Sequence, residues 1–225
     1  MIILSCLIWG ILSAFVMVGA IKWYLPKLRK QDIQKNSVNE NLGKNRKKYL
    51  LILCLMVILA MICGGISYNR QDEIINMIKM LITLCILGVI SLTDIELYKI
   101  PNLCCVILLV GRTICFIPEF IINIEKFKMS LFNSVLTGIL CLVLLVVISK
   151  VTRSGLGYGD IKLFAALGFM CGMRAILYTL VICFFICAIA SLVLLILKIK
   201  SVKDELPLGP FIYLGFVTTI ILGLC

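Results

Sequence analysis

The chain has 225 residues, of which 62% are hydrophobic, well above the roughly 45–50% typical of soluble globular domains. It carries 22 Lys and Arg residues against 11 Asp and Glu residues, a net charge of +11, and it contains no histidine. The hydrophobicity excludes an ordinary water-soluble core. The missing histidine excludes Ser-His-Asp and Cys-His nucleophilic sites and every His-based zinc site.

Apolar runs of about 20 residues recur along the whole chain, and such a run is long enough to cross a bilayer as a helix. The first run has neither a basic segment before it nor a small-residue cleavage site, so we expect it to be retained as a span. We predict one all-α, polytopic integral membrane domain over residues 1–225, with about eight transmembrane helices. The predicted spans are about 2–21, 50–68, 75–93, 102–118, 129–148, 161–173, 175–197 and 208–225.

Basic residues are concentrated in alternate connections between these spans. Nine of the 22 lie between Lys22 and Lys48, and others follow the third, fifth and seventh spans, whereas the remaining connections are nearly balanced in charge. By the positive-inside rule, the basic segments, including a loop over 22–49, are expected on the cytoplasmic side and both termini outside. The charge therefore indicates a lipid bilayer as partner. Nucleic acid is not expected, because no basic face is interleaved with aromatic residues.

The twelve cysteines form no C-x-x-C pair, and those inside apolar runs include Cys54, Cys63, Cys85, Cys141, Cys183 and Cys187. We expect them to pack as small hydrophobic residues, with no metal site and no redox pair. The adjacent Cys104 and Cys105 should point to different faces of a helix.

Two acidic residues lie at the edges of predicted spans. Asp94 ends the third span and Asp160 opens the sixth, with one outward and one return span between them. This even number places both on the cytoplasmic face. An acidic residue at a helix centre in lipid costs roughly 2.5–3.5 kcal/mol, so each is a candidate functional group. Two close carboxylates can share one proton and act as acid and base near neutral pH.

Asp160 follows a glycine-rich segment, because residues 155–163 read G-L-G-Y-G-D-I-K-L. Gly157 and Gly159 would let another backbone approach closely, so an extended substrate could pair with main-chain groups there. A plain glycine-rich turn is the alternative. A phosphate-binding loop is not supported, since no G-K-[ST] follows. Lys162 is either a partner for the carboxylate charge or an ordinary anchor on the basic side.

Asp94 lies in the segment 91–102, S-L-T-D-I-E-L-Y-K-I-P-N. Pro101 suits the first turn of the next helix. Glu96 either supports the acidic pair or faces water.

Together the two segments resemble the paired motifs of the type IV prepilin peptidases, the bacterial branch of the G-x-G-D intramembrane aspartic proteases. Asp94, Glu96 and the pair Pro101-Asn102 match the first motif in order and spacing, and Gly157–Leu163 matches the second. A weaker similarity to the opening of the family's last span involves Pro207, Gly209 and Pro210.

The resemblance implies an aspartic endopeptidase with Asp94 and Asp160 as catalytic residues and with no cofactor. The implied substrate is a membrane-inserted prepilin or pseudopilin, whose basic leader is cut next to its hydrophobic helix, typically after a glycine, in the bacterial cytoplasmic membrane. Many members carry paired C-x-x-C motifs in the first cytoplasmic loop and also N-methylate the mature pilin. Residues 22–48 contain no cysteine, which argues against zinc binding and against methyltransferase activity.

Two other classes of function remain open at this point. A proton- or cation-coupled transporter or channel would explain membrane acids, and it predicts them near the bilayer midplane. A non-catalytic membrane scaffold would use both aspartates only as helix caps. The oligomeric state and the individual pilin-like substrate are left open by the sequence.

Overall fold

The computed structural model describes residues 2–20, 22, 26, 46–70, 73–152, 157–198 and 206–225. Regular structure in these residues is entirely helical, and one helix lies on each predicted span, which confirms the all-α class with about eight helices. Five are long and apolar enough to cross a membrane, namely α4, α5, α6, α8 and most of α3. The helices are α1 (Ile2–Gly19), α3 (Arg46–Asn69), α4 (Ile74–Leu97), α5 (Asn102–Ile122), α6 (Ile124–Val151), α7 (Tyr158–Cys171), α8 (Met173–Ile196) and α9 (Gly209–Leu222).

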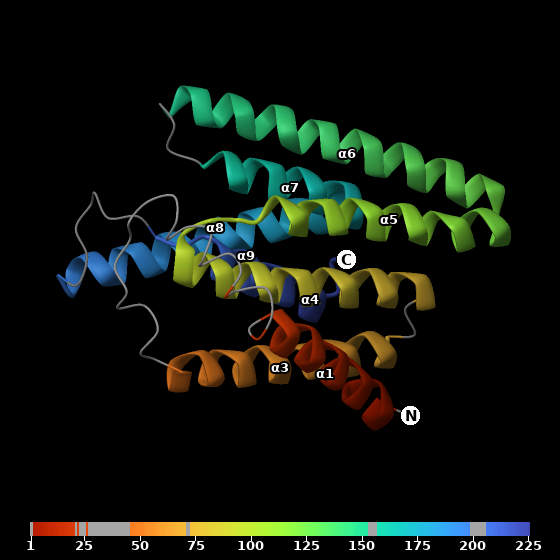
Figure 1. The fold of residues 1–225 in the computed structure, drawn as a ribbon. Coiled ribbons are helices and arrows are strands. Elements are labelled where there is room, and N and C mark those ends of the chain that lie inside the picture. The colour runs from red at the N-terminus through yellow and green to blue at the C-terminus, as the bar shows by residue number, and fades with distance from the viewer. Residues whose placement is uncertain are drawn as a thin grey trace.

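Successive helices run back and forth along one bundle (Figure 1). Ser5, near the start of α1, donates a hydrogen bond to the carbonyl of Gly64 near the end of α3, at 2.9 Å. Arg70, which follows α3, donates to the carbonyls of Ile220 and Ile221 at the end of α9, at 2.9 and 2.7 Å. Both chain ends therefore lie at the α3–α4 end of the bundle. The α4–α5 connection and the starts of α7 and α9 lie at the opposite end (Figure 1, left).

Helix α4 is the centre of the bundle, since it packs against α1, α3, α5, α7 and α9. Every residue from Thr83 to Asp94 is buried. A helix that is hydrophobic on all sides is expected to be surrounded by other helices. The central helix thus carries one of the two candidate acids into the interior.

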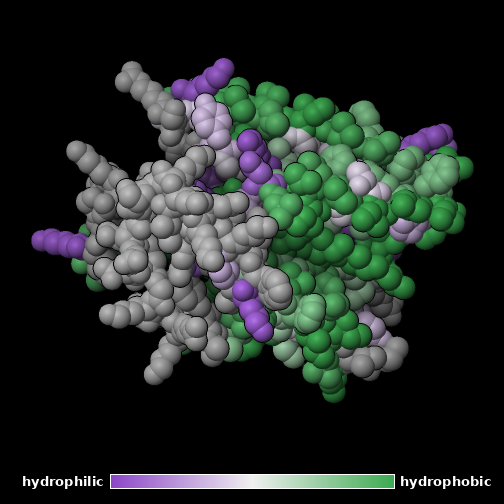
Figure 2. Space-filling model, viewed as in Figure 1, coloured by the Kyte–Doolittle hydropathy of each residue, from purple (hydrophilic) through white to green (hydrophobic). Residues whose placement is uncertain are grey.

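The outer helices expose large apolar side chains, for example Ile114 on α5, Leu144 on α6 and Val181 on α8. The face seen in Figure 2 is largely hydrophobic over the described helices, and its hydrophilic residues lie nearer the two ends. Such a surface is far larger than the apolar patches that soluble monomers expose. It is the surface of a membrane protein.

Several helix ends differ from the predicted boundaries. Helix α4 continues to Leu97, so Asp94 lies within its last turn, and Tyr98 ends it in a left-handed conformation with φ 50°. Helix α5 runs past Pro118 to Ile122, and α6 begins at Ile124, where the Asn123 side chain caps it by accepting two backbone N–H bonds. Backbone hydrogen bonding continues beyond the point where hydropathy falls, so these helices are longer than their apolar runs.

The break between α7 and α8 is the single residue Gly172, two positions before the gap between the predicted spans 161–173 and 175–197. Gly172 has φ +84°, which favours glycine, while Met173 and Arg174 already belong to α8. A Cβ atom at this position would also lie 2.9 Å from Asn133 Nδ2. The tight break explains why α7 is short.

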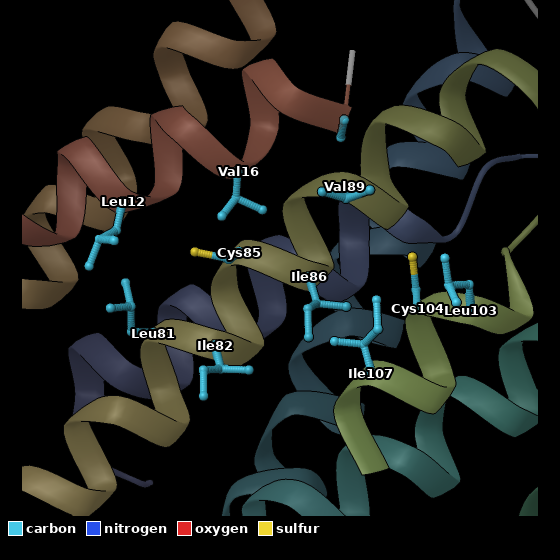
Figure 3. A pocket seen from close by; sticks show the side chains of 11 residues that line it. Leu12, Val16, Leu81, Ile82, Cys85, Ile86, Val89, Leu103, Cys104 and Ile107 are labelled. Atoms are coloured by element: carbon cyan, nitrogen blue, oxygen red, sulfur yellow. The ribbon is translucent and has the colours of Figure 1, made fainter. Parts of the chain in front are cut away.

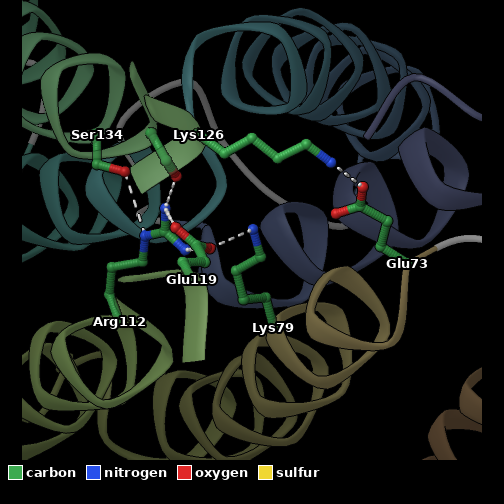
Figure 4. Close-up of polar contacts among 7 residues, drawn as sticks. Glu73, Lys79, Arg112, Glu119, Lys126 and Ser134 are labelled. Atoms are coloured by element: carbon green, nitrogen blue, oxygen red, sulfur yellow. Dashed lines mark hydrogen bonds and ion pairs between the residues drawn. The ribbon is translucent and has the colours of Figure 1, made fainter. Parts of the chain in front are cut away.

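A buried ionic network joins α4, α5 and α6 at the end of the bundle that holds the chain termini (Figure 4). Arg112 Nη1 donates to Glu119 Oε1 at 2.8 Å, and Arg112 also donates to the hydroxyls of Ser130 and Ser134. Lys79 Nζ lies 3.4 Å from the same Glu119 oxygen. The sequence reasoning missed Lys79 and Arg112, although a charged residue inside an apolar run is itself a signal.

We predict that Glu119→Gln destabilises the protein, because it leaves two cations in a largely buried site without their carboxylate. Removing one partner of a buried pair typically costs about 3–5 kcal/mol. The thermal unfolding midpoint in detergent measures this loss. Glu125→Gln is the matched control, because the Glu125 side chain is 80% exposed in its pair with Lys128. Such an exposed ion pair contributes about 1 kcal/mol or less to stability. Equal midpoints for the two variants would contradict the prediction.

Candidate active site

Asp94 is buried at the end of the bundle opposite the termini, with 6% of the residue exposed. Its Oδ2 atom accepts a hydrogen bond from the backbone N–H of Gly209, at 2.7 Å. The backbone N–H of Leu208 forms a second hydrogen bond to this carboxylate. Both donors belong to the start of α9, and the first N–H groups of a helix have no partner within the helix. The Asp94 carboxylate is the partner of these N–H groups.

Gly209 leaves almost no room for a side chain, so a Cβ atom there would require its neighbours to shift. A Cβ atom there would lie 3.0 Å from Asp94 Cβ, 3.1 Å from Asp94 Oδ2 and 3.2 Å from Ser91 Cα. Pro210 follows as the second residue of α9, where its missing N–H removes no helical bond. The proline-glycine segment noted in the sequence, with Pro207 before it, therefore builds a close contact between α9 and α4.

Asp160 is the third residue of α7, after the N-cap residue Gly157. The backbone N–H of Gly157 donates to its carboxylate, which is the usual reach of an acidic residue back to the helix cap. Helix α7 is not among the five that are long enough to span a membrane. Burial, and then the nearby charge of Asp94, raise the pKa of Asp160 to about 6, against the opposing effect of the Gly157 bond.

A contact between the two motifs brings the acids together. A Cβ atom on Gly159 would lie 3.3 Å from Ile100 Cβ, so the α4–α5 connection lies directly against the first turn of α7. Asp94 ends α4 just before this connection, and Asp160 follows Gly159 by one residue. The predicted meeting of two distant segments at one end of the bundle therefore appears in the structure.

The other predicted site residues take different positions. Glu96 is 3% exposed, so it does not face water, and its support of the acidic pair stays a prediction. Lys162 is exposed and lies on a groove with Asn102, on a different side of α7 from Asp160. Pro101 is the N-cap residue of α5, one position earlier than expected. Gly155 and most of the basic loop 22–49 lie outside the described residues.

Two apolar grooves flank α5. The groove in Figure 3, of about 550 Å³, lies between α1, α4 and α5, and its lining includes Val16, Ile86 and Cys104. The second, of about 500 Å³, lies between α5, α6 and α7, and its lining includes Cys105 and Lys162. The adjacent cysteines thus face different sides of α5, as predicted.

Sequence reasoning missed three features of the site. The amides of Leu208 and Gly209 bind Asp94, and Ile100 packs on Gly159, although neither pairing has a local signal. The Ser91 hydroxyl, one turn before Asp94, is buried with no hydrogen-bond partner among the described residues. It is thus available to a group that binds beside Asp94.

The site offers two carboxyl groups, backbone donors to each and buried surroundings. In the described part of the chain, no three Cys, Asp or Glu side chains are grouped so as to hold a metal ion. This arrangement suits acid–base chemistry between two carboxyls that influence each other's protonation.

Comparison with known proteins identifies the segment that carries both acids. Residues 81–192 match the type IV leader peptidase family, and this range includes Asp94, Pro101, Asn102 and the G-x-G-D segment. Neither a comparison with curated proteins nor one with solved structures gave a match. The match over 81–192 agrees with the motifs and with the meeting of the two acids, so this chain belongs to the type IV leader peptidase family.

Proposed function

We propose that this protein is an intramembrane aspartic endopeptidase that removes the basic leader from prepilin or pseudopilin-like substrates at the cytoplasmic membrane face. The observation that carries the proposal is the contact of the α4–α5 connection, at Ile100, with Gly159 at the start of α7, which brings the segments of Asp94 and Asp160 together at one end of the bundle. Membership in a leader peptidase family supports the reaction and the class of substrate.

In this mechanism the two carboxyl groups share one proton. Two close carboxylates resist double ionisation, so one stays protonated while the other is charged. The ionised group takes a proton from water as the water attacks the peptide carbonyl. The protonated group donates a hydrogen bond to the carbonyl oxygen, where negative charge develops.

The distribution of charge supports a cytoplasmic site. Lys99 and Lys198 follow α4 and α8, and Lys150 lies in the last turn of α6, all at the end of the bundle that holds the acids. The opposite end carries a nearly balanced set in which Glu73 and Glu125 pair with lysines. By the positive-inside rule, the first end faces the cytoplasm and the chain termini face outward. A transporter would need acids near the midplane, whereas Asp94 lies in the last turn of its helix.

We assign the hydrophobic helix of the substrate to the groove between α1, α4 and α5 (Figure 3). The lining of this groove carries no charge, and it reaches Leu103 and Cys104 at the start of α5, just after the first motif. The groove between α5, α6 and α7 has Lys162 in its lining. A basic leader emerging beside Lys162 would meet a like charge, which disfavours the second groove.

Replacing either aspartate by asparagine should abolish leader cleavage, because an amide can neither accept nor supply the shared proton. Asp94→Asn and Asp160→Asn would be assayed with a purified prepilin-like substrate in liposomes, at matched protein levels. Glu73→Gln is the control, since its 63% exposed side chain lies at the other end of the bundle. Retained cleavage by either aspartate variant would refute the peptidase proposal.

The pH dependence of cleavage should follow the proton that the pair shares. Because the pKa of Asp160 is raised to about 6, first by burial and then by the charge of Asp94, the group loses its proton as the pH rises through that value. The cleavage rate at low substrate concentration should therefore fall above about pH 6. Unfolding midpoints recorded over the same range separate this effect from loss of structure. A cleavage rate that climbs steadily from pH 5 to pH 8 would contradict this prediction.

The two adjacent cysteines can report which groove holds the substrate. In a chain whose other cysteines are replaced by alanine, Cys104 alone should form a disulfide with a cysteine in the apolar helix of the substrate. Cys105 alone should not, because it lines the other groove. Cleavage by both single-cysteine proteins confirms that they fold. Preferential capture by Cys105 would move the substrate to the groove beside Lys162.

A further inference from the structure

We infer that the first turn of α9, through the N–H groups of Leu208 and Gly209, holds Asp94 in its ionised form, so that Asp94 deprotonates the water and Asp160 carries the shared proton. This inference rests on the proposed peptidase function. It assigns a positioning role to Leu208 and Gly209, which touch Asp94 and need not touch the substrate.

The hydrogen bonds of Asp94 favour one protonation state. Its carboxylate accepts the N–H of Gly209 at 2.7 Å and also that of Leu208. Backbone N–H groups only donate, so they bind a charged oxygen more strongly than a neutral one. The partial positive charge at the start of α9 acts in the same direction. An ionised Asp94 is thus stabilised although it is buried.

These donors are held in place by the rest of α9. The Tyr213 hydroxyl donates to the carbonyl of Met56 on α3 at 2.9 Å, and Thr219 pairs with Thr179 on α8 at 3.2 Å. Arg70 binds the carbonyls at the far end of the helix. A helix fixed to two neighbours presents its N–H groups in one orientation, which is the condition for electrostatic preorganisation.

Asp160 has a different environment. One backbone N–H, that of Gly157, donates to its carboxylate, and this donor belongs to the cap of its own helix. Burial disfavours the charged form of both acids, and the charge of each disfavours that of the other, so the donors make the difference: Asp94 has a 2.7 Å bond from the start of another helix, and Asp160 has only the cap of its own helix. When the pair holds a single proton, that proton therefore resides on Asp160.

Among the described residues, few other charged groups face Asp94 from the elements that pack against α4, and Lys99 follows Asp94 on the α4–α5 connection. The described residues of α1 and α9 include no Asp, Glu, Lys or Arg. Helix α7 contributes Asp160 and, on another side, Lys162, while Glu96 follows Asp94 on its own helix. Arg112 of α5 lies at the far end, bound to Glu119. At the same end as Asp94, α3 begins with Arg46, Lys47 and Lys48.

The assignment gives a balanced reaction. Asp94 removes a proton from water, the water oxygen bonds to the carbonyl carbon, and the carbonyl oxygen takes the proton of Asp160, which gives a gem-diol. The carbon–nitrogen bond then breaks as Asp94 returns its proton to the nitrogen. Asp160 recovers a proton from one of the two hydroxyls. The products are a carboxylic acid and an amine, and the pair regains its starting state.

The pH profile of Gly209→Ala tests the assignment. The added Cβ would lie 3.0 Å from Asp94 Cβ, so the carboxylate must move away from its donors. Weaker stabilisation of the ionised form should move the acidic limb of the cleavage rate upward by about one pH unit, a tenfold change in ionisation constant. Gly111→Ala is the control, because its Cβ would meet only Ile82 at an ordinary 3.5 Å, and it should leave both limbs unchanged.

A second variant removes the donor without adding an atom that could disturb packing. Replacing the amide N–H of Gly209 by an ester oxygen, through incorporation of glycolic acid, should also shift the acidic limb upward. If Gly209→Ala is inactive, this ester variant alone tests the assignment. An unchanged profile for the ester would overturn the inference. An upward shift of the alkaline limb alone would overturn it too, because Asp94 would then carry the proton. A wild-type protein that cleaves no prepilin would instead refute the proposed function.

Discussion

An ionised carboxylate buried in a helical bundle needs hydrogen-bond donors from the protein itself, and the position of Asp94 depends on this constraint. Helix α4 packs against five others and only 6% of Asp94 is exposed, so an ionised side chain there depends little on bulk solvent for its hydrogen bonds. The start of α9 supplies the donors instead. This requirement fixes the register of α9 against α4, and it explains why a glycine stands where the two helices meet.

The rest of the site follows from how the chain returns to the same end of the bundle. Each pair of helices brings the chain back, so that the end of α4 and the starts of α7 and α9 lie together (Figure 1). At this end Ile100 lies directly against Gly159, so the segments that carry the two acids are in contact. At the opposite end, Arg112, Glu119 and Lys79 join α4, α5 and α6. One end is thus stabilised by paired opposite charges, and the other holds two carboxyl groups close together.

Much of this arrangement could be read from the sequence, because it depends on local patterns. The apolar runs predicted the helices, and the alternation of basic connections predicted which connections lie at the same end of the bundle. The spacing around Asp94 and Asp160 indicated a shared site. The placement of Lys162 was also within reach, since two residues along a helix turn a side chain by about 200° away from Asp160. The helix ends at Leu97 and Ile122 were not, because backbone hydrogen bonds continue where hydropathy no longer reports them.

The partners of Asp94 could not be predicted for a different reason. Gly209 lies 115 residues further along the chain, and no periodicity in either segment specifies which amide meets which carboxylate. Buried Arg112 was overlooked because one charge hardly lowers the average hydropathy of a long run. Features of this kind depend on tertiary packing, which the order of residues encodes only through the whole fold.

Gly209 lies outside the segment by which the chain is assigned to its family. The segment shared with the leader peptidases ends at residue 192, before α9 begins. A fragment trimmed to that segment would keep both aspartates and yet lack the amides that solvate one of them. The smallest piece of this chain with a complete acidic pair therefore extends beyond the region by which its ancestry is recognised.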